Sequence, residues 1–511
     1  MDPDDFAARA TKQPVYKLSP EVLSNIFIEY AALLPNPSKQ QHSLCPVYLK
    51  WIAATYVCRY WRSVALGCTT LWRRLVFFNP EVTKEMIRRA KGSNLEVRIK
   101  GLIPQKLSAV VDEALRMVIP ELYHISTLHL QLHKHLLQPL VDGFASAAPN
   151  LECILLRPLH EDKIHVPDTI FAQKMPALRS LELEYCTLMT PSPSSSTSDP
   201  HLVHIPSTMS QIVSYIRRMP TLHTLTLTEV LPEEMSADTV YPKLALPELS
   251  NLTLTGSITS CINFLERLVL PLTTATYIDC KRLSQNANYH RLFRSFRTAI
   301  GNGEGDLAIH ALVITPRRVT SLSGSGFRLH YALAHRHSSP RTIVTFSFHC
   351  WDPYPGMFED VLSTASRTIS QTDIHDLLVD AFDDSDYSDW ISGVRHHLPN
   401  IPNICLSKMR LRDFIIALGD RDSPMLPHLR NLLFIEVYFW PQDVQLLLNC
   451  LESRFLSGMP IKAIHLSDCI RLFEPDVRRM EKFVQLVDWD GHEEDDDDDD
   501  DDDEDYNVVF D

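Results

Sequence analysis

Histidine is the residue type in this chain that could most readily bind a metal, and it gathers in two places. These are His129, His133 and His135, and then His330, His335 and His337. A zinc site needs a tight tetrahedral set of ligands, and neither group has a supporting cysteine or carboxylate. If residues 128–132 form a strand, all three histidines of the first group lie on the face opposite its leucines. We therefore expect solvated faces and no metal.

Aspartates gather between residues 380 and 389, but the pattern lacks the central glycine and terminal glutamate of a calcium loop. We expect a solvated loop there. Residues 323–326, SGSG, do not form the Gly-x-Ser-x-Gly motif of a nucleophile elbow, and no glycine-rich phosphate loop is present. Because no acid and base are paired at a useful spacing, we expect no catalytic residues, no cofactor and no enzyme activity.

Thirteen consecutive acidic residues, 493–505, form the most charged stretch of the chain. Such a run is too charged to fold and predicts a disordered tail. Leaving it out changes the formal net charge from −15 to −2, so the rest has no basic surplus for nucleic acid. The tail could serve solubility, capture a basic protein by long-range attraction, or shield a basic patch of this chain.

The composition predicts a folded intracellular protein, cytoplasmic or nuclear. Apolar residues make up 45% of the 511 positions, enough for a sizeable core. There is no apolar run of membrane-spanning length and no secretory signal. The eleven cysteines are scattered without a Cys-x-x-Cys pair, which favours reduced core thiols over disulfides or a zinc knuckle.

A small helical unit is predicted near the N-terminus. Residues 18–27, LSPEVLSNIF, combine a capping serine, a first-turn proline and apolar residues at helical spacing. Residues 57–65, VCRYWRSVA, predict a second helix with apolar residues on one face and arginines on another. The polar insert 31–50 separates them, and the pair Leu71-Trp72 closes the unit.

Together these segments resemble the F-box, in the diverged form called F-box-like. The likeness rests on L-x-P-E-V-L-x-x-I-F, on V-C-R-x-W-R-x-V-A and on the closing Leu-Trp pair. It covers about the first eighth of the chain, with Ser19 in place of the usual proline and a long insert. The resemblance implies a three-helix module that docks on the Skp-type adaptor of an SCF cullin–RING ubiquitin ligase.

Carried over by position, the resemblance implies two adaptor-binding patches. The first patch would consist of Leu18, Pro20, Leu23 and Ile26, and the second of Val57, Cys58, Trp61 and Trp72. An amphipathic helix laid into an apolar groove, with a tryptophan as anchor, is the physical basis of such docking. Internal packing of the same residues is the alternative, and the sequence leaves both open.

A repeat of the form apolar-x-x-apolar-x-apolar fills most of the remaining chain. Four clear copies follow a proline, and begin at Leu178, Leu222, Leu249 and Leu429. Weaker copies begin at Ile125, Leu151, Ile309, Ile343, Ile374, Ile401 and Ile461, with a degenerate one near residues 276–278. The alternating end of each copy predicts a strand, and helical spacing appears between copies. The copies that begin at Leu178 and Ile461 both carry a cysteine at the turn after the strand, Cys186 and Cys469.

One strand and one helix per repeat resembles a leucine-rich-repeat solenoid, with parallel strands on a concave wall and helices on the convex side. The predicted fold class is therefore α/β. The leucines and isoleucines of the strands are expected in the core. Polar residues between them could contact a protein partner or only keep the wall soluble: Arg179, Glu182, Glu184, His223, Thr224, Thr226, Arg430 and Asn431.

These expectations divide the chain into five parts. They are a leader (1–16), the F-box-like domain (17–78), a linking strand–helix repeat (79–124), the solenoid (125–487, with a loop near 190–200) and the acidic tail (488–511). In the linker region we predict a strand at 73–78, a helix at 82–90 and a strand at 95–99.

The predicted function is that of a substrate-recognition subunit of an SCF-type ligase, which binds the Skp-type adaptor through the F-box and an unidentified target protein through the repeats. Two alternatives stay open. One is a repeat scaffold outside any ligase, whose F-box-like segment is a structural cap that the repeats cover. The other is a chaperone-like binder of basic proteins through the acidic tail. No nucleic acid or membrane partner is expected.

Overall fold

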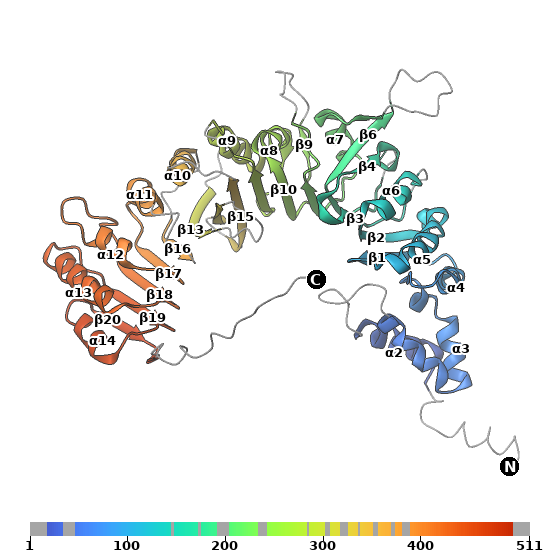
Figure 1. Cartoon of the computed structure of the whole chain (residues 1–511), viewed down its shortest axis with the longest axis horizontal. Coiled ribbons are helices and arrows are strands. Elements are labelled where there is room, and N and C mark those ends of the chain that lie inside the picture. The colour runs from blue at the N-terminus through green and yellow to red at the C-terminus, as the bar shows by residue number, and fades with distance from the viewer. Residues whose placement is uncertain are drawn as a thin grey trace, which may run out of the picture. The chain divides into compact units, whose positions relative to one another are not determined.

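The computed structural model describes residues 18–33, 46–144, 148–171, 175–191, 204–233, 243–283, 286–301, 307–316, 325–335, 338–350, 356–368, 374–380 and 389–493. The chain divides into two compact units, residues 1–254 with 267–271, and residues 255–266 with 272–511. Both combine helices with mainly parallel strands, as the predicted α/β class requires (Figure 1). Within the described ranges, no helix combines the length and apolar character needed to cross a bilayer.

Four short helices come first in the described part of the first unit. Their bounds are α2 (Pro20–Leu33), η2 (Pro46–Tyr56), α3 (Arg59–Gly67) and η3 (Thr69–Trp72). At the start of α2 the Ser19 hydroxyl accepts a hydrogen bond from the Val22 amide (3.4 Å). The helices extend further than predicted, because residues 31–33 continue α2 and η2 includes residues 46–50. The predicted insert 31–50 is therefore shorter, and its centre lies outside the described residues, as does the leader 1–16.

The predicted strand at residues 73–78 is wrong. Arg74 makes an isolated parallel bridge to Glu96, and residues 75–79 do not form a β-strand. The Thr83 hydroxyl donates to the Val76 carbonyl (2.6 Å), so a side chain satisfies the group that a neighbouring strand would have bound. The helix and strand predicted after it are present as α4 (Pro80–Ala90), capped by Asn79, and β1 (Leu95–Lys100).

Parallel strands joined by helices form the body of the first unit. The strand order is β1, β2 (Ile125–Leu132), β3 (Cys153–Pro158), β5 (Ser180–Glu184), β8 (Thr224–Thr228) and β10 (Asn251–Ser257). The intervening helices are α5 (Gln105–Arg116), η4 (Ile119–His124), α6 (Lys134–Asp142), η5 (Leu159–Glu161), η6 (Asp168–Phe171) and α7 (Met209–Ile216). Leu181 and Leu183 on β5 are both buried, as the period-two pattern predicted.

Two small sheets supplement this unit, and the sequence did not indicate them. One contains β4 (Ile164–Pro167), β6 (Cys186–Pro191) and β7 (His204–Pro206), and the other pairs β9 (Leu244–Ala245) with β11 (Leu268–Val269). The predicted loop near residues 190–200 begins within β6, and most of it lies outside the described residues.

The second unit departs from the predicted repeat at its start. It begins with α8 (Ile258–Leu265), β12 (Ala275–Lys281) and α9 (Tyr289–Ile300), and then contains β13 (Leu307–Pro316), β14 (Ser325–His335) and β15 (Ser338–Cys350). The copies at Ile309 and Ile343 are strands, but both pair antiparallel with β14. Buried Phe327, Leu329 and Tyr331 hold β14 in place, so a strand stands where the repeat predicted a helix.

The remainder of the second unit returns to alternation of strand and helix. Its elements are α10 (Met357–Thr368), β16 (Asp376–Asp380), α11 (Asp389–His397), β17 (Asn403–Ser407), α12 (Arg412–Gly419), β18 (Asn431–Ile435), α13 (Pro441–Leu456), β19 (Ala463–Ser467), α14 (Glu474–Met480) and β20 (Leu486–Trp489). Strands β16 to β20 are parallel and adjacent in order. Helices α11, α12 and α13 lie along one side of these strands (Figure 1).

Equivalent turns follow several strands. Tyr185, Lys408, Glu436 and Asp468 come directly after a strand and adopt left-handed backbone angles, with φ between 50° and 52°. The cysteines predicted at this turn behave alike, since Cys186 donates its thiol to the Leu156 carbonyl and Cys469 to the Phe434 carbonyl. Nine of the cysteines, Cys186 and Cys469 among them, are free thiols, as expected.

The last repeat ends in residues that the sequence assigned to the tail. The predicted tail boundary at residue 488 is wrong, because β20 extends to Trp489. Asp490 accepts hydrogen bonds from the Asp468 amide (2.6 Å) and the His492 amide (2.9 Å), and Glu493 accepts from the Glu474 amide (2.9 Å). In earlier turns a strand carbonyl binds the corresponding amide, so the Asp490 carboxylate replaces the missing next strand.

We expect Asp490→Ala to destabilise the second unit by about 1 kcal/mol at neutral pH, because two amides lose their acceptor. Burial raises the pKa of Asp490, but the two backbone amides outweigh it and lower the pKa below its usual value. The carboxylate therefore contributes stability above the unfolded-state pKa of about 4, and this contribution fades as pH falls through the folded-state pKa. Urea unfolding of both proteins across this pH range checks the prediction; equal stability at neutral pH contradicts it.

Candidate protein-binding surface

The four N-terminal helices pack around a small aromatic interior. Leu23 and Phe27 on α2 are buried, and the Phe27 ring meets Trp61 of α3 edge to face, with 5.2 Å between ring centroids. The Tyr60 hydroxyl donates to the Leu18 carbonyl (2.7 Å) and ties the start of α2 to α3. The side of α2 that carries Leu23 is thus fixed against α3.

A second aromatic pair closes the unit on the side of η3. Trp51 and Trp72 are both buried and meet edge to face, with 5.0 Å between centroids. The Trp72 indole donates to the Ala65 carbonyl (3.1 Å), and the Arg89 guanidinium of α4 lies over its ring at 4.7 Å. Trp72 therefore joins the helical unit to the first repeat, and its side chain is an internal anchor.

One edge of α2 carries large apolar side chains that remain exposed. They are Val22, Ile26, Tyr30 and Leu33. At about 100° per residue, these four positions fall within an arc of about 80° beside the arc of Leu23 and Phe27. The apolar surface of α2 is therefore wider than the part that packs internally. We call these four side chains the α2 stripe.

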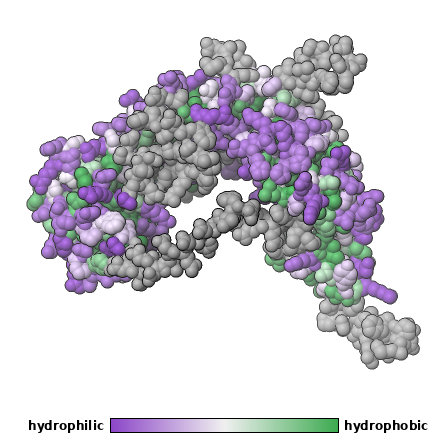
Figure 2. All heavy atoms as spheres, viewed as in Figure 1, coloured by the Kyte–Doolittle hydropathy of each residue, from purple (hydrophilic) through white to green (hydrophobic). Residues whose placement is uncertain are grey.

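A second exposed apolar patch lies where η2 meets α3. Tyr56 and Val57 are largely exposed, with Val57 at 61%. The next residue, Cys58, caps α3, because its sulfur accepts a hydrogen bond from the Trp61 amide (3.4 Å). We call Tyr56 and Val57 the junction patch. Figure 2 shows hydrophobic surface over these N-terminal helices.

The structure separates the eight predicted adaptor contacts into three groups. Pro20, Ile26 and Val57 are exposed; Leu18, Cys58 and Trp61 are half-buried; Leu23 and Trp72 are buried. The prediction missed four exposed apolar residues, namely Val22, Tyr30, Leu33 and Tyr56. Their signal was present, since Val22, Ile26 and Tyr30 recur at intervals of four.

The helical unit joins the repeats through η3 and the residues after it. Helix α4 packs against η3, and Arg73 forms an ion pair with Glu96 of β1 (2.7 Å). Helix α2 instead packs on η2, α3 and η3, with the α2 stripe exposed. This arrangement differs from that expected of a structural cap, in which Ile26 would be covered by the repeats.

We expect Leu23→Ala to destabilise the helical unit by about 3 kcal/mol, because Leu23 is 0% exposed and truncation leaves a cavity. Ile26→Ala should change stability by less than about 1 kcal/mol, because Ile26 is 45% exposed. Amide hydrogen exchange of α2 and α3 measures both effects. A larger loss of protection for Ile26→Ala than for Leu23→Ala would contradict this assignment.

The first histidine group does not share one face, so that prediction was wrong. His129 lies on β2, where Arg98 donates to its Nδ1 (3.4 Å), whereas His133 directly precedes α6 and His135 belongs to α6. Burial, and then Arg98, lower the pKa of His129 to about 4, partly offset by Glu96. His129 is therefore neutral at physiological pH and accepts from Arg98.

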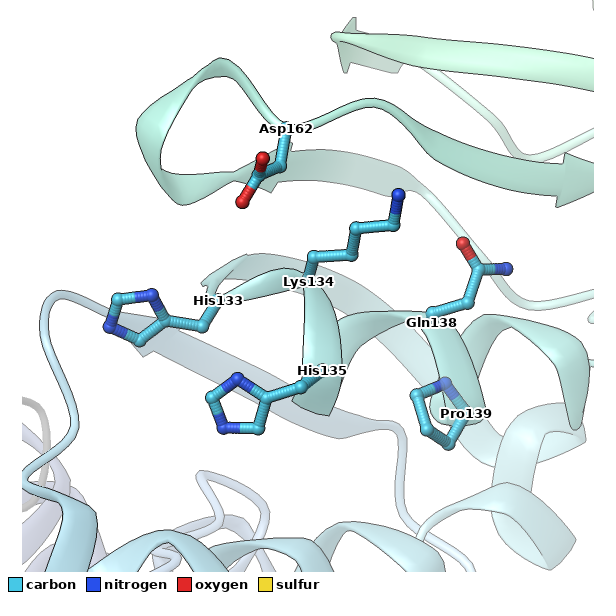
Figure 3. A pocket seen from close by; sticks show the side chains of 6 residues that line it. All are labelled: His133, Lys134, His135, Gln138, Pro139 and Asp162. Atoms are coloured by element: carbon cyan, nitrogen blue, oxygen red, sulfur yellow. The ribbon is translucent and has the colours of Figure 1, made fainter.

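A hollow of about 480 Å³ lies beside α6, lined by His133, Lys134, His135, Gln138, Pro139 and Asp162 (Figure 3). The His133 ring stacks near-parallel on those of His135 and His160, with centroids 5.6 and 5.3 Å away. Parallel rings do not direct their nitrogens at one point, as a metal ion requires. Across the described residues, no group of three histidines, cysteines or carboxylates could hold a metal.

The other candidate clusters do not assemble a site in the described part of the chain. Asp380 ends β16 and Asp389 begins α11, whereas Asp383, Asp384 and Asp386 lie outside it. His330 bridges the hydroxyls of Thr315 and Thr345 within the sheet. His337 and the first half of the 323–326 segment are also outside the described residues.

The polar residues predicted on the repeat wall have local partners in several cases. Glu184 pairs with Arg157 of the neighbouring strand (3.1 Å), and Glu182 accepts from the Ser180 hydroxyl (3.1 Å). Asn431 donates to Asn403 (2.7 Å). Arg179 and Arg430 are exposed, and His223, Thr224 and Thr226 are half-buried.

In comparisons with known proteins, no protein-family model and no curated protein sequence matches this chain.

Proposed function

We propose that this chain is the substrate-recognition subunit of an SCF-type cullin–RING ubiquitin ligase. The N-terminal helical unit would act as an F-box-like domain and bind the Skp-type adaptor, while the repeats bind a target protein. The observation that carries the proposal is the α2 stripe, together with the junction patch: exposed apolar side chains on the helices that resemble an F-box.

The α2 stripe has the chemistry of a helix that binds in a partner's apolar groove. Its side chains recur along one edge of a helix whose other edge is packed, so α2 is already ordered before it meets a partner. Preorganisation lowers the entropy cost of binding. Tyr30 and Tyr56 add aromatic contact area, a feature common at the centres of protein interfaces.

The way the parts connect supports the proposed roles of the helical unit and the repeats. The helical unit is attached through η3 and α4, while the repeats present long rows of strand side chains. Such a subunit performs no bond chemistry. It raises the effective concentration of target lysines near the ubiquitin-charged enzyme by tethering.

Reconstitution tests the proposal. The intact chain is mixed with a Skp-type adaptor, cullin, RING protein, charged conjugating enzyme and ubiquitin. We expect ubiquitin to be attached to the chain's own lysines when the adaptor is present and not when it is omitted. Modification that is equally fast without adaptor, or absent with it, would contradict the receptor function and favour a non-ligase scaffold.

A further inference from the structure

The exposed face of strands β16 to β20 is acidic. Along these strands one set of side chains is buried, and the alternate set faces away from the core. The alternate set includes Asp376, Asp380 and Asp488, and Asp490 follows β20 in the same phase. Among the residues of these five strands that lie on this face there is no lysine or arginine. We call it the acidic face.

Side-chain amide, imidazole and backbone amide groups bind the carboxylates of the acidic face. Asp376 accepts from the Asn403 amide (2.8 Å), Asp488 from the His465 imidazole (3.0 Å), and Asp490 from backbone amides. The corresponding face of the first unit differs, because Glu184 there pairs with Arg157 and Glu96 with Arg98. In the first unit, arginines on the strands balance this negative charge. On β16 to β20 the outward strand positions hold no such cation, and the exposed Arg430 and Lys462 lie just before β18 and β19.

A short apolar row crosses the acidic face. Leu378, Cys405 and Leu433 are directly in register on β16, β17 and β18, and all three are partly exposed. Beside them, Asp376, Asn403 and Asn431 form a ladder of hydrogen bonds between side chains. The row can therefore contact apolar side chains of a ligand without breaking this ladder.

The apolar row leads to a hollow of about 240 Å³ on β18 to β20. Leu433 and Ile435 provide apolar walls, and His465, Ser467, Asp488 and Asp490 provide polar ones. A lysine or arginine has the complementary structure, with an aliphatic stem and a cationic end. Its stem would contact Leu433 and Ile435, and its charge would lie beside the two carboxylates.

We propose that the acidic face binds an extended basic segment of the target protein. One lysine or arginine side chain enters the hollow, and apolar side chains cover the row. Five strands span about 19 Å, the length of about six extended residues. The acidic run 493–505 begins three residues after Asp490 and adds charge of the same sign, which attracts a basic segment at longer range. That the segment belongs to a ligase target rests on the proposed function.

Fluorescence anisotropy with the intact chain tests this inference. The probe is a labelled peptide of about ten residues in which pairs of lysines alternate with pairs of valines, so that each side of the extended peptide carries both residue types. The control peptide carries glutamate for lysine. We expect the lysine peptide to bind with an affinity that falls as salt is added, and the glutamate peptide not to bind. Equal binding of both peptides would overturn the proposal.

A matched pair of variants separates the acidic face from overall charge. Asp376→Asn with Asp488→Asn should weaken lysine-peptide binding at least about fivefold. Asp112→Asn with Glu248→Gln makes the same charge change in the first unit and should leave binding within about twofold. Equal weakening by both pairs, or none by the first, would overturn the proposal.

Removal of residues 494–511 distinguishes the acidic face from the acidic run. The truncated chain should keep binding the lysine peptide and remain sensitive to the Asp376/Asp488 pair. Complete loss of binding would show that the acidic run alone captures the peptide and would overturn the proposal. Adaptor binding is measured on the same proteins, so failure of this inference is distinguishable from failure of the receptor function.

Discussion

Ile26→Asp is expected to lower the affinity of the chain for a Skp-type adaptor about 100-fold and to leave its fold intact. Ile26 lies in the α2 stripe and is 45% exposed, so aspartate there remains solvated in the free protein. In the complex the carboxylate would be buried in an apolar groove without a partner. A 100-fold loss corresponds to about 2.7 kcal/mol, the size of an interface hot spot. Titration calorimetry of each variant measures the effect.

Two further variants make the test of Ile26 specific. Val57→Asp alters the junction patch between η2 and α3, whereas Ile26→Asp alters α2. We expect Val57→Asp to weaken adaptor binding as well. Ile416→Asp changes an equally exposed isoleucine of α12 (53%) in the second unit and should leave the affinity unchanged. If Ile416→Asp weakens adaptor binding as much as Ile26→Asp does, the α2 stripe is not the adaptor site.

Arg454→Ala is expected to destabilise the second unit by about 3–5 kcal/mol. Arg454 on α13 is buried and donates to the carbonyls of Met425 (3.1 Å) and Leu426 (2.9 Å), with a longer contact to Leu418 (3.4 Å). Truncation would remove these contacts and open a cavity, although the Leu426 carbonyl would keep its hydrogen bond from the Leu429 amide (3.0 Å). Leu426 itself has a left-handed backbone (φ 51°), so the turn it belongs to depends on such bonds.

The control for Arg454 is Arg478→Ala. Arg478 on α14 is exposed and pairs with Glu474 one helical turn away, a contact worth less than about 0.5 kcal/mol. Urea unfolding followed by tryptophan fluorescence compares the two variants with the wild type. Similar stability for Arg454→Ala and Arg478→Ala would show that the carbonyl contacts of Arg454 contribute little.

Most strands could be predicted from the sequence because every copy of the repeat has the same local pattern of apolar residues. An apolar residue at every second position, as in Leu181 and Leu183, must place both side chains on the same face of a strand. Parallel pairing followed from the helices between the copies. The strand β14 was missed for the same reason, because its Phe327, Leu329 and Tyr331 alternate correctly but do not fit the repeat template.

The candidate site was predicted less completely, and α2 shows why. Leu23 and Ile26 both belong to its broad apolar arc, so helical spacing alone assigns them the same role. Which edge packs is decided by α3, through contacts such as that between Tyr60 and Leu18, 42 residues apart. The sequence therefore indicated the candidate binding helix but not which of its leucines and isoleucines face outward.

The predicted boundary between the folded chain and the acidic tail was wrong for a related reason. In the sequence, Asp490 and Glu493 adjoin a long acidic run and look like part of it. Their role as hydrogen-bond acceptors depends on the backbone amides of Asp468 and Glu474, which only the folded last repeat brings within reach. Charge alone does not distinguish a capping carboxylate from a solvated one.

The affinity of the intact wild-type chain for a purified Skp-type adaptor tests the central claim most directly. Isothermal titration at physiological salt should give a one-to-one complex with a dissociation constant in or below the micromolar range. Absence of binding, with the chain shown to be folded by circular dichroism, would contradict the receptor function. The N-terminal helices would then be a structural element of a scaffold whose partners bind the repeats.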